Sequence, residues 1–285
     1  MAVDPIRGGL SGPDLAAVAE LEARVIAADG GRLKLEWPWL RSRTAGQVND
    51  FLWREHGQML GFAGLYGMGH AGTVEIAGMV DPRARRRGIG TALLNDALLI
   101  AAERSFDEAL SVVPRNHAGG FEFALAHGGT LDHSEHALLL TERPAGSAGA
   151  EGLAFRRADE DDIPQLSWLL TAGFGDAPSS YERMLSDPAS RTLMIEREDE
   201  VVGTLRVIDD SGIYGFVIDP KHQGKGLGRE ALRLTCEDLF DRGAESVHLE
   251  VEVNNDRALG LYTSLGFTLV STEDYYALEV GSRAG

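Results

Sequence analysis

Cysteine is nearly absent from this chain. Cys236 is the single cysteine among 285 residues, which excludes an internal disulfide framework and a cysteine-based metal cluster. Long hydrophobic runs are also missing, because the longest, such as residues 97–102, are far shorter than the roughly 20 residues that a membrane span needs. The first ten residues contain Asp4, Pro5 and two glycines and do not resemble a signal peptide. We therefore expect a cytoplasmic protein without a membrane partner.

Positive charge is scarce as well. The chain has 27 Lys and Arg against 44 Asp and Glu, a formal net charge of −17. Residues 1–145 carry 18 acidic against 14 basic side chains, and residues 146–285 carry 26 against 13. Nucleic-acid binding needs a basic surface, so we expect no nucleic-acid partner. The acidic second half suits a cationic amine substrate, although an acidic surface that only aids solubility is the simpler explanation.

The chain contains an internal duplication. Residues 79–90 match residues 217–228, with the Asp-Pro pairs and the glycines of the two segments offset by 138. Further on, Leu110-x-Val112-x-x-x-Asn116 matches Leu249-x-Val251-x-x-x-Asn255 at an offset of 139. A nearly constant offset over this length indicates two copies of one domain.

The two copies are expected to form separate domains of the same kind. The first spans residues 1–143 and the second residues 152–285, with a Gly- and Pro-containing linker between them. In the second copy, hydrophobic patterning predicts strands at 153–157, 192–197, 201–208, 213–218, 247–253 and within 269–280, and helices from about 159, at 226–240 and at 257–265. In the first copy it predicts strands at 3–7, 51–56, 59–66, 74–80, 110–113 and 137–140, and helices at 14–28 and 90–104. Each copy is then an α/β (α+β) domain with a mixed, mostly antiparallel sheet flanked by helices.

A glycine-rich loop joins a strand to a helix in each matched segment. Such a loop presents several backbone N–H groups to an anion, and the helix N-terminus adds about half a positive charge. Lys225 and Arg229, or residues 85–87 in the first copy, supply further positive charge. A P-loop would need Ser or Thr after Lys225, where Gly226 stands, and a dinucleotide fingerprint would follow the first strand of a parallel unit. The loop therefore predicts phosphate binding of another kind.

The loop resembles the pyrophosphate loop of the GNAT family of acyl-CoA N-acyltransferases. Gln223-x-x-Gly226-x-Gly228 and Arg85-x-x-Gly88-x-Gly90 both match its Gln/Arg-x-x-Gly-x-Gly/Ala pattern, and residues 247–267 resemble the second motif of the family. The resemblance implies two tandem GNAT-like domains and acetyl-CoA as the cofactor. It also implies transfer of the acetyl group to a primary amine of a small molecule or peptide by direct attack.

The same resemblance implies a set of cofactor-binding residues. They are Val217, Ile218, Gln223, Gly224, Lys225, Gly226, Leu227, Gly228, Arg229 and Asn255 in the second copy, and Met79, Val80, Arg85, Arg86, Arg87, Gly88, Ile89, Gly90 and Thr91 in the first. The backbone N–H groups of Val217 and Ile218 are expected to stabilise the oxyanion. Asn255 is expected either to hold the pantetheine arm or to cap the helix that follows it.

Tyr262 is the general acid that the resemblance implies for the departing CoA thiolate. A thiol pKa of about 8.5 lies close enough to a phenol pKa of about 10 for that proton transfer. The alternative is that Tyr262 serves only in packing. Glu250 and Glu252 are the candidate general bases, and His222 is less favoured. Alternatively, the two glutamates simply lie on a solvent-exposed face of the sheet and have no catalytic role. Family members often place a base on the strand before the loop, where the first copy has Glu75 and an offset of 138 gives Ile213 in the second.

The two copies differ at the position of the general acid. Counting from Asn116 puts Phe123 where Tyr262 stands, and Gly119-Gly120 weakens the helix that would carry it. We expect the first domain to be degenerate and the second to be catalytic.

Three functions stay open at this point. One is general acetyl transfer to an amine. Another is suggested by the tandem layout and by residues 262–268 and 276–278, which are similar to the mycothiol synthase family of two-domain acetyltransferases. The third is a non-catalytic acyl-CoA-binding sensor or scaffold. We expect no metal site, because no carboxylate or cysteine pattern accompanies the histidines, and a monomer or homodimer.

Overall fold

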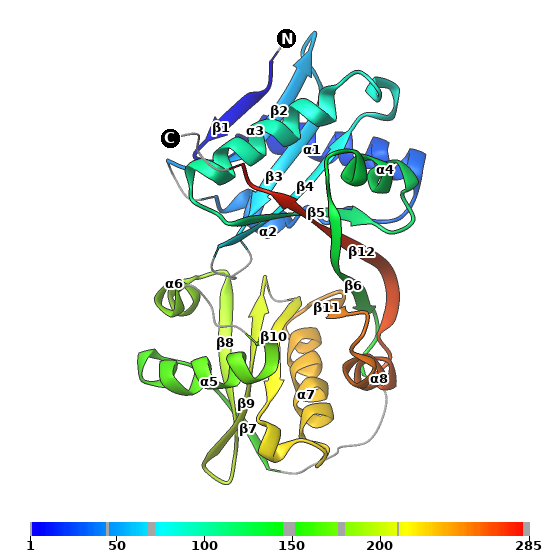
Figure 1. Cartoon of the computed structure of the whole chain (residues 1–285). Coiled ribbons are helices and arrows are strands. Elements are labelled where there is room, and N and C mark those ends of the chain that lie inside the picture. The colour runs from blue at the N-terminus through cyan, green and yellow to red at the C-terminus, as the bar shows by residue number, and fades with distance from the viewer. Residues whose placement is uncertain are drawn as a thin grey trace. The chain divides into compact units, whose positions relative to one another are not determined.

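The protein forms two compact units, which exchange strands. The computed structural model describes residues 2–43, 46–67, 72–144, 152–175, 180–209 and 211–281. Unit 1 contains Met1–Ser134 together with Ser271–Gly285, and unit 2 contains Glu135–Val270 (Figure 1). Most of the linker expected at 143–152 lies outside the described residues.

Unit 1 is a mixed sheet with helices on both faces. Its elements are β1 (Asp4–Arg7), α1 (Gly12–Asp29), α2 (Trp37–Arg41), β2 (Val48–Glu55), β3 (Gln58–Tyr66), β4 (Thr73–Val80), the 3₁₀ turn η1 (Pro82–Ala84), α3 (Ile89–Glu103), β5 (Glu108–Pro114) and α4 (Ala118–Ala126), with most of β12 (Thr268–Glu279). The strand order is β1-β2-β3-β4-β5-β12. The β4–β5 pair is parallel, and the other neighbouring strands in this order are antiparallel.

Unit 2 repeats this plan. Its elements are β7 (Leu153–Arg157), η2 (Glu160–Asp162), α5 (Ile163–Phe174), α6 (Tyr181–Ser186), β8 (Ser190–Arg197), β9 (Glu200–Ile208), β10 (Gly212–Ile218), η3 (Pro220–His222), α7 (Leu227–Asp241), β11 (Val247–Glu252) and α8 (Asp256–Ser264), with most of β6 (Thr130–Leu140). The order is β6-β11-β10-β9-β8-β7, and β10 and β11 are the parallel pair. The expected α/β class and its mostly antiparallel mixed sheets are confirmed.

Local sequence explains the long first helix. Ser11 caps α1, since its hydroxyl accepts from the Asp14 N–H at 3.3 Å while the Asp14 carboxylate accepts from the Ser11 N–H. Val18, Leu21 and Val25 recur at helical spacing and are fully or almost fully buried against the sheet. Gly30 ends the helix with a positive φ of 72°. Helix α3 packs on the opposite face of the same sheet.

Each unit is completed by a strand from the other half of the sequence. Strand β6 pairs with β11 from Val247↔Leu140 to Glu252↔Glu135, and β12 pairs with β5 from Glu273↔Pro114 to Glu279↔Glu108. The expectation that residues 137–140 complete the first sheet and residues 269–280 the second is wrong. Alternating hydrophobicity shows that a segment is a strand but does not show which strand it pairs with. No helix in the described ranges is long and apolar enough to cross a membrane.

Candidate active site

The glycine-rich loops of the two units have the same backbone conformation. Gly226 and Gly88 begin α7 and α3 with φ of 79° and 80°, and an added Cβ at either position would meet nothing within 4 Å. These glycines are therefore required by the left-handed backbone. Gly224 also has a positive φ of 75°, whereas Arg86 holds the corresponding conformation in unit 1 at 60°.

The first residue of each loop motif folds back onto the strand before it. Gln223 Nε2 donates to the Ile218 carbonyl at 2.8 Å, and Arg85 Nε donates to the Val80 carbonyl at 3.2 Å. These side chains close the loop against the end of the strand. The two loops are equivalent in structure as well as in sequence.

The strand before the loop contains an extra residue in unit 2. Ile218 pairs with Gly203 as Val80 pairs with Gly61, but further back Gly212 pairs with Ile208 where Glu75 pairs with Tyr66. The register of β10 shifts between Tyr214 and Val217, and Gly215 lies there with φ 55°. This is a β-bulge, which unit 1 lacks over the same span of β4.

The bulge accompanies an earlier end to the pairing of the two parallel strands. Among the described residues β10 pairs with β11 at Gly212↔His248, and β4 pairs with β5 from Thr73↔Glu108 to Ile76↔Ser111. Since Gly212 corresponds to Glu75, the pairing in unit 2 ends one position earlier on the side of the loop. Beyond those pairs the strands diverge and leave an edge of each strand unpaired. We call these the β10/β11 opening and the β4/β5 opening.

The β10/β11 opening exposes a backbone donor. Asp219 N–H donates to the Val202 carbonyl on β9 at 2.9 Å. Successive N–H groups of a strand point to alternate edges, so the Val217 N–H also faces β9 and the Ile218 N–H faces the opening. Of the two donors expected from the sequence, this geometry favours Ile218.

Helix α8 carries Tyr262 and Asn255 two turns apart. Asn255 is the N-cap, and its Oδ1 accepts from the Ala258 N–H at 3.1 Å, which leaves its amide NH₂ for another partner. The Tyr262 ring packs among buried apolar side chains beside Phe267, and burial raises the pKa of Tyr262 to about 12. With this pKa the phenol is protonated at neutral pH. Within the described part of the chain no residue hydrogen-bonds its hydroxyl.

A comparison of α4 with α8 corrects the alignment of the two copies. Both helices have nine residues and begin 138 positions apart, and His117 caps α4 as Asn255 caps α8. An added Cβ on Gly90 would lie 3.2 Å from Phe123, and one on Gly228 would lie 3.8 Å from Leu261. Phe123 therefore corresponds to Leu261, and Ala124 stands in the place of Tyr262. The first copy still lacks the hydroxyl, but the residue in the place of Tyr262 is Ala124 and not Phe123.

Known proteins with the same arrangement place the chain in a family. The family model described as "Acetyltransferase (GNAT) family" matches residues 21–119 and 157–267, one segment in each copy. The chain belongs to the GNAT family. It is accordingly an acetyl-CoA-dependent N-acetyltransferase, as the loop motifs implied.

Several known proteins match the chain over nearly its whole length. The chain is 28% identical to a mycothiol acetyltransferase of Propionibacterium freudenreichii over 94% of its length and 90% of the relative. It is 30% identical to one of Thermomonospora curvata, covering 94% of this chain and 95% of the relative. A GCN5-related N-acetyltransferase from Sphaerobacter thermophilus superposes with a TM-score of 0.76 at 21% identity, over 96% and 95% of the two chains. A tandem GNAT protein from the clavulanic acid biosynthesis pathway superposes with a TM-score of 0.69 at 17% identity, over 98% of both.

The other candidate catalytic residues of this GNAT enzyme lie in different places. Glu250 and Glu252 alternate along β11 with buried apolar residues that pack in the core under α7, so both lie on the opposite face of the sheet. Glu252 is exposed and is paired in register with Glu135. His222 Nε2 lies 3.3 Å from Glu200 beside the loop and not at the opening. Nothing in the contacts selects one of them as the base, so each stays a prediction.

Glu75 of unit 1 is held in a buried polar network. Its carboxylate lies 3.6 Å from Lys34 Nζ, and Lys34 also donates to the Tyr275 hydroxyl at 2.5 Å. Lys34 and Tyr275 are 5% and 0% exposed. Because of the bulge, the residue of unit 2 that corresponds to Glu75 is Gly212 and not Ile213. This correction leaves the conclusion unchanged that unit 2 has no acid at this position.

The arginines of the unit 1 loop are largely engaged by acids. Arg85 pairs with Asp29 and Arg87 pairs with Glu55, while exposed Arg86 has no partner among the described residues. Thr91 Oγ1 lies 3.2 Å from His127 Nε2, and the tautomer of the ring decides which of the two donates the hydrogen bond. In unit 2, by contrast, Lys225 has no ion pair among the described residues, and Arg229 donates to Ser264 Oγ at 2.6 Å.

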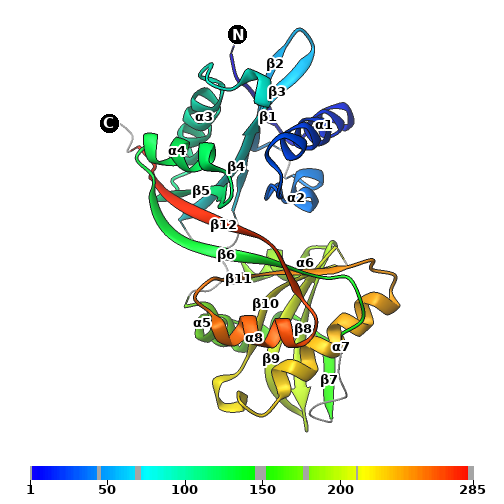
Figure 2. The same ribbon diagram turned by 90° about the vertical axis from the view of Figure 1, so that its right-hand side faces the viewer.

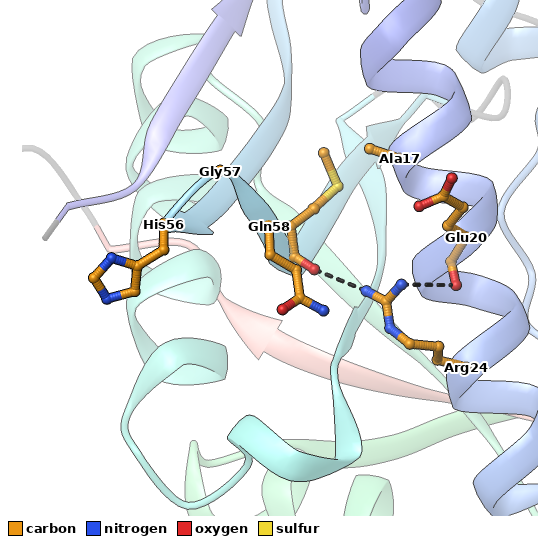
Figure 3. A pocket seen from close by; sticks show the side chains of 7 residues that line it. Ala17, Glu20, Arg24, His56, Gly57 and Gln58 are labelled. Atoms are coloured by element: carbon orange, nitrogen blue, oxygen red, sulfur yellow. Dashed lines mark hydrogen bonds between the residues drawn. The ribbon is translucent and has the colours of Figure 1, made fainter.

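Arg24 of α1 holds the start of the unit 1 loop. Its Nε donates to Asp81 at 2.8 Å and its Nη2 to the Met59 carbonyl at 2.9 Å, and it also contacts the Glu20 carbonyl (Figure 3). Burial alone would raise the pKa of Asp81, but hydrogen bonds from Arg83 and Arg24 lower it to about 2. The adjoining pocket of about 310 Å³ lies between α1 and the β2–β3 turn. A second pocket of similar volume adjoins Lys225 and His222 in unit 2.

Sequence reasoning did not identify three residues near the openings. Asp29 ends α1, His117 caps α4, and Arg257 lies in the first turn of α8. Arg257 could have been noted as a cation within the second GNAT motif. Asp29 carries no such signal, because it reaches the loop only through the packing of α1 on the sheet.

Proposed function

We propose that unit 2 is the catalytic half of this acetyltransferase and that acetyl transfer takes place in the β10/β11 opening. The observation that carries the proposal is the bulge at Gly215, which directly follows Gly212↔His248, the last pair of β10 with β11 among the described residues. Unit 1 has no such bulge, and its corresponding strands stay paired one position further toward the loop, at Ile76↔Ser111. The pantetheine arm needs an unpaired strand edge, so the unit in which this edge begins earlier suits it better.

The residues of unit 2 fit a bound acetyl-CoA. The N–H groups at the start of α7, with Lys225 and Arg229, would hold the pyrophosphate. The remaining amide of Asn255 would hold the pantetheine arm. The Ile218 N–H would donate to the acetyl carbonyl oxygen as negative charge develops there. When bound, acetyl-CoA supplies the activated acetyl thioester that the acceptor amine attacks.

Tyr262 is proposed as the general acid. The phenol is protonated at neutral pH, and its hydroxyl has no hydrogen-bond partner among the described residues, so its proton is available to the sulfur of CoA. Glu250, Glu252 or solvent would remove the proton from the attacking amine, since an unperturbed lysine-like amine has a pKa of about 10.4. A cytoplasmic location and a small-molecule or peptide amine as acceptor stay predictions of the sequence.

The test is the Tyr262→Phe variant. We expect acetyl transfer to a panel of primary amines to fall by about 100-fold or more, because general acid catalysis typically contributes 10²–10⁴. Binding of CoA and the melting temperature should change little, since the ring is kept. The matched control is Tyr276→Phe, which removes the hydroxyl of a tyrosine that packs against Ala124 of unit 1. Unchanged transfer by Tyr262→Phe would show that the acid is misassigned.

The mycothiol acetyltransferases favour one acceptor for this chain. Their similarity extends over 94% of it and includes both copies, so the acceptor of those enzymes is the first amine to assay. Preferential acetylation of that acceptor over a lysine peptide would support a mycothiol acetyltransferase. Binding of CoA without acetylation of any amine would instead support an acyl-CoA sensor.

A further inference from the structure

A charged side chain spans the β4/β5 opening of unit 1. The Asp29 carboxylate accepts two hydrogen bonds from the Arg85 guanidinium, one of them 2.9 Å long, and its Oδ2 lies 3.4 Å from His117 Nε2. Arg85 follows β4 and His117 follows β5, and these strands stop pairing at Ile76↔Ser111. Asp29 therefore connects the two sides of the opening where the strands have diverged.

The turn after α1 closes the same opening further. A Cβ added to Gly31 would lie 2.8 Å from Asn116 Nδ2, so this turn lies directly against the end of β5. The hydrogen bonds from Arg85 are the largest influence on Asp29 and lower the pKa of its carboxyl, against the opposing effect of burial. Asp29 is therefore ionised at neutral pH and neutralises the loop cation that a phosphate would otherwise meet.

The corresponding bridge in unit 2 has the opposite charge. Arg257 Nη1 donates to Gln223 Oε1 at 2.8 Å, and Gln223 is the counterpart of Arg85. Arg257 is exposed, and its bridging partner is neutral, so the positive charge at this mouth is not cancelled. Helix α5, which ends at a glycine cap as α1 does, has Phe174 as its last residue and no carboxylate there. Figure 2 shows α8 beside α7 at this end of unit 2.

We infer that the charge of the bridging side chain selects which half of the chain takes acetyl-CoA: Arg257 recruits the cofactor phosphates to unit 2, and Asp29 closes unit 1 to them. This inference rests on the proposed function, because it assumes that both loops descend from a cofactor site. Coenzyme A is strongly anionic. Arg257 exchanges one neutral partner for a phosphate, whereas Asp29 must leave the Arg85 cation and the His117 ring and repels the incoming anion.

The test is calorimetric titration of the full chain with CoA. The variants are Asp29→Ala, with Glu122→Ala on the exposed face of α4 as its charge-matched control, and Arg257→Gln, with exposed Arg157→Gln on β7 as its control. We expect one site per chain in the wild type and in Glu122→Ala, and a second, weaker site in Asp29→Ala. Arg257→Gln should weaken the wild-type site about tenfold or more, as expected for loss of a charged hydrogen bond, and Arg157→Gln should not.

Each outcome bears on a different statement. Two sites of similar affinity in the wild type, or a single site in folded Asp29→Ala, would overturn the inference about Asp29 and leave the role of Tyr262 untouched. Arg257→Gln with wild-type affinity would overturn the inference about Arg257. Absence of any CoA binding by the wild type would instead contradict the proposed function. A melting curve of each variant shows whether it is folded.

Discussion

At the scale of single residues, the same loop is built with different side chains in the two units. Gly224 and Arg86 both adopt a left-handed backbone, at φ 75° and 60°. An L-residue in that conformation costs roughly 1–2 kcal/mol, a cost that glycine does not have. The first loop therefore keeps its shape at an energetic disadvantage, and Arg86 adds an exposed cation to it.

Arg86→Gly is expected to stabilise unit 1. Relief of the left-handed strain outweighs the greater flexibility of glycine in the unfolded chain by roughly 0.5–1 kcal/mol. Thermal or urea unfolding of the full chain measures this difference. Arg86→Ala is the control, because alanine removes the guanidinium and keeps the strain. Equal stabilisation by both variants would show that charge, and not backbone conformation, is responsible.

Residue-level prediction from the sequence succeeded where a motif fixes a backbone shape. The loop glycines and the Asp-Pro turns have local causes and were placed correctly. Of the two roles left open for Asn255, the structure shows the helix cap. The pairing of Phe123 with Tyr262 was wrong by one residue, because Asn116 next to His117 offered a false anchor for the alignment. Only the matching caps and the contacts of Gly90 and Gly228 revealed the true register.

At the scale of elements, the decisive difference is one extra residue in β10. It moves Ile213 and Ile218 onto the same face, although they are five positions apart, and both pack in the core under α7. The offset between the copies consequently changes from 137 before the bulge to 138 after it. A bulge has little sequence signal beyond a glycine in a strand, so the sequence did not predict it.

Gly215→Val is expected to impair acetyl transfer by more than about tenfold. A β-branched residue is strongly disfavoured at the positive φ of Gly215, so β10 should become regular and approach β11. Gly215→Asn is the control, since asparagine tolerates the left-handed region. Steady-state rates and melting temperatures of both variants are the measurements. A folded Gly215→Val enzyme with full activity would contradict the role given to the bulge.

At the scale of the whole molecule, the two sequence copies are not the two structural units. Strands β6 and β12 carry residues that pack in the core of the unit built mainly from the other copy. Tyr276 of the second copy lies in a small core with Val113 and Ala124, and Leu140 of the first copy lies in the core of unit 2. Neither half of the chain therefore contains all the strands of one sheet, which explains why duplication alone could not predict the domain contents.

The central claim is that the cofactor and the chemistry belong to unit 2. Hydrogen exchange of the full chain, measured by mass spectrometry with and without saturating CoA, tests it most directly. CoA should slow exchange at the N-terminal end of α7 and in the loop before it, residues 223–231, where backbone N–H groups face the pyrophosphate. Protection confined to residues 85–93, with residues 223–231 unchanged, would contradict the claim.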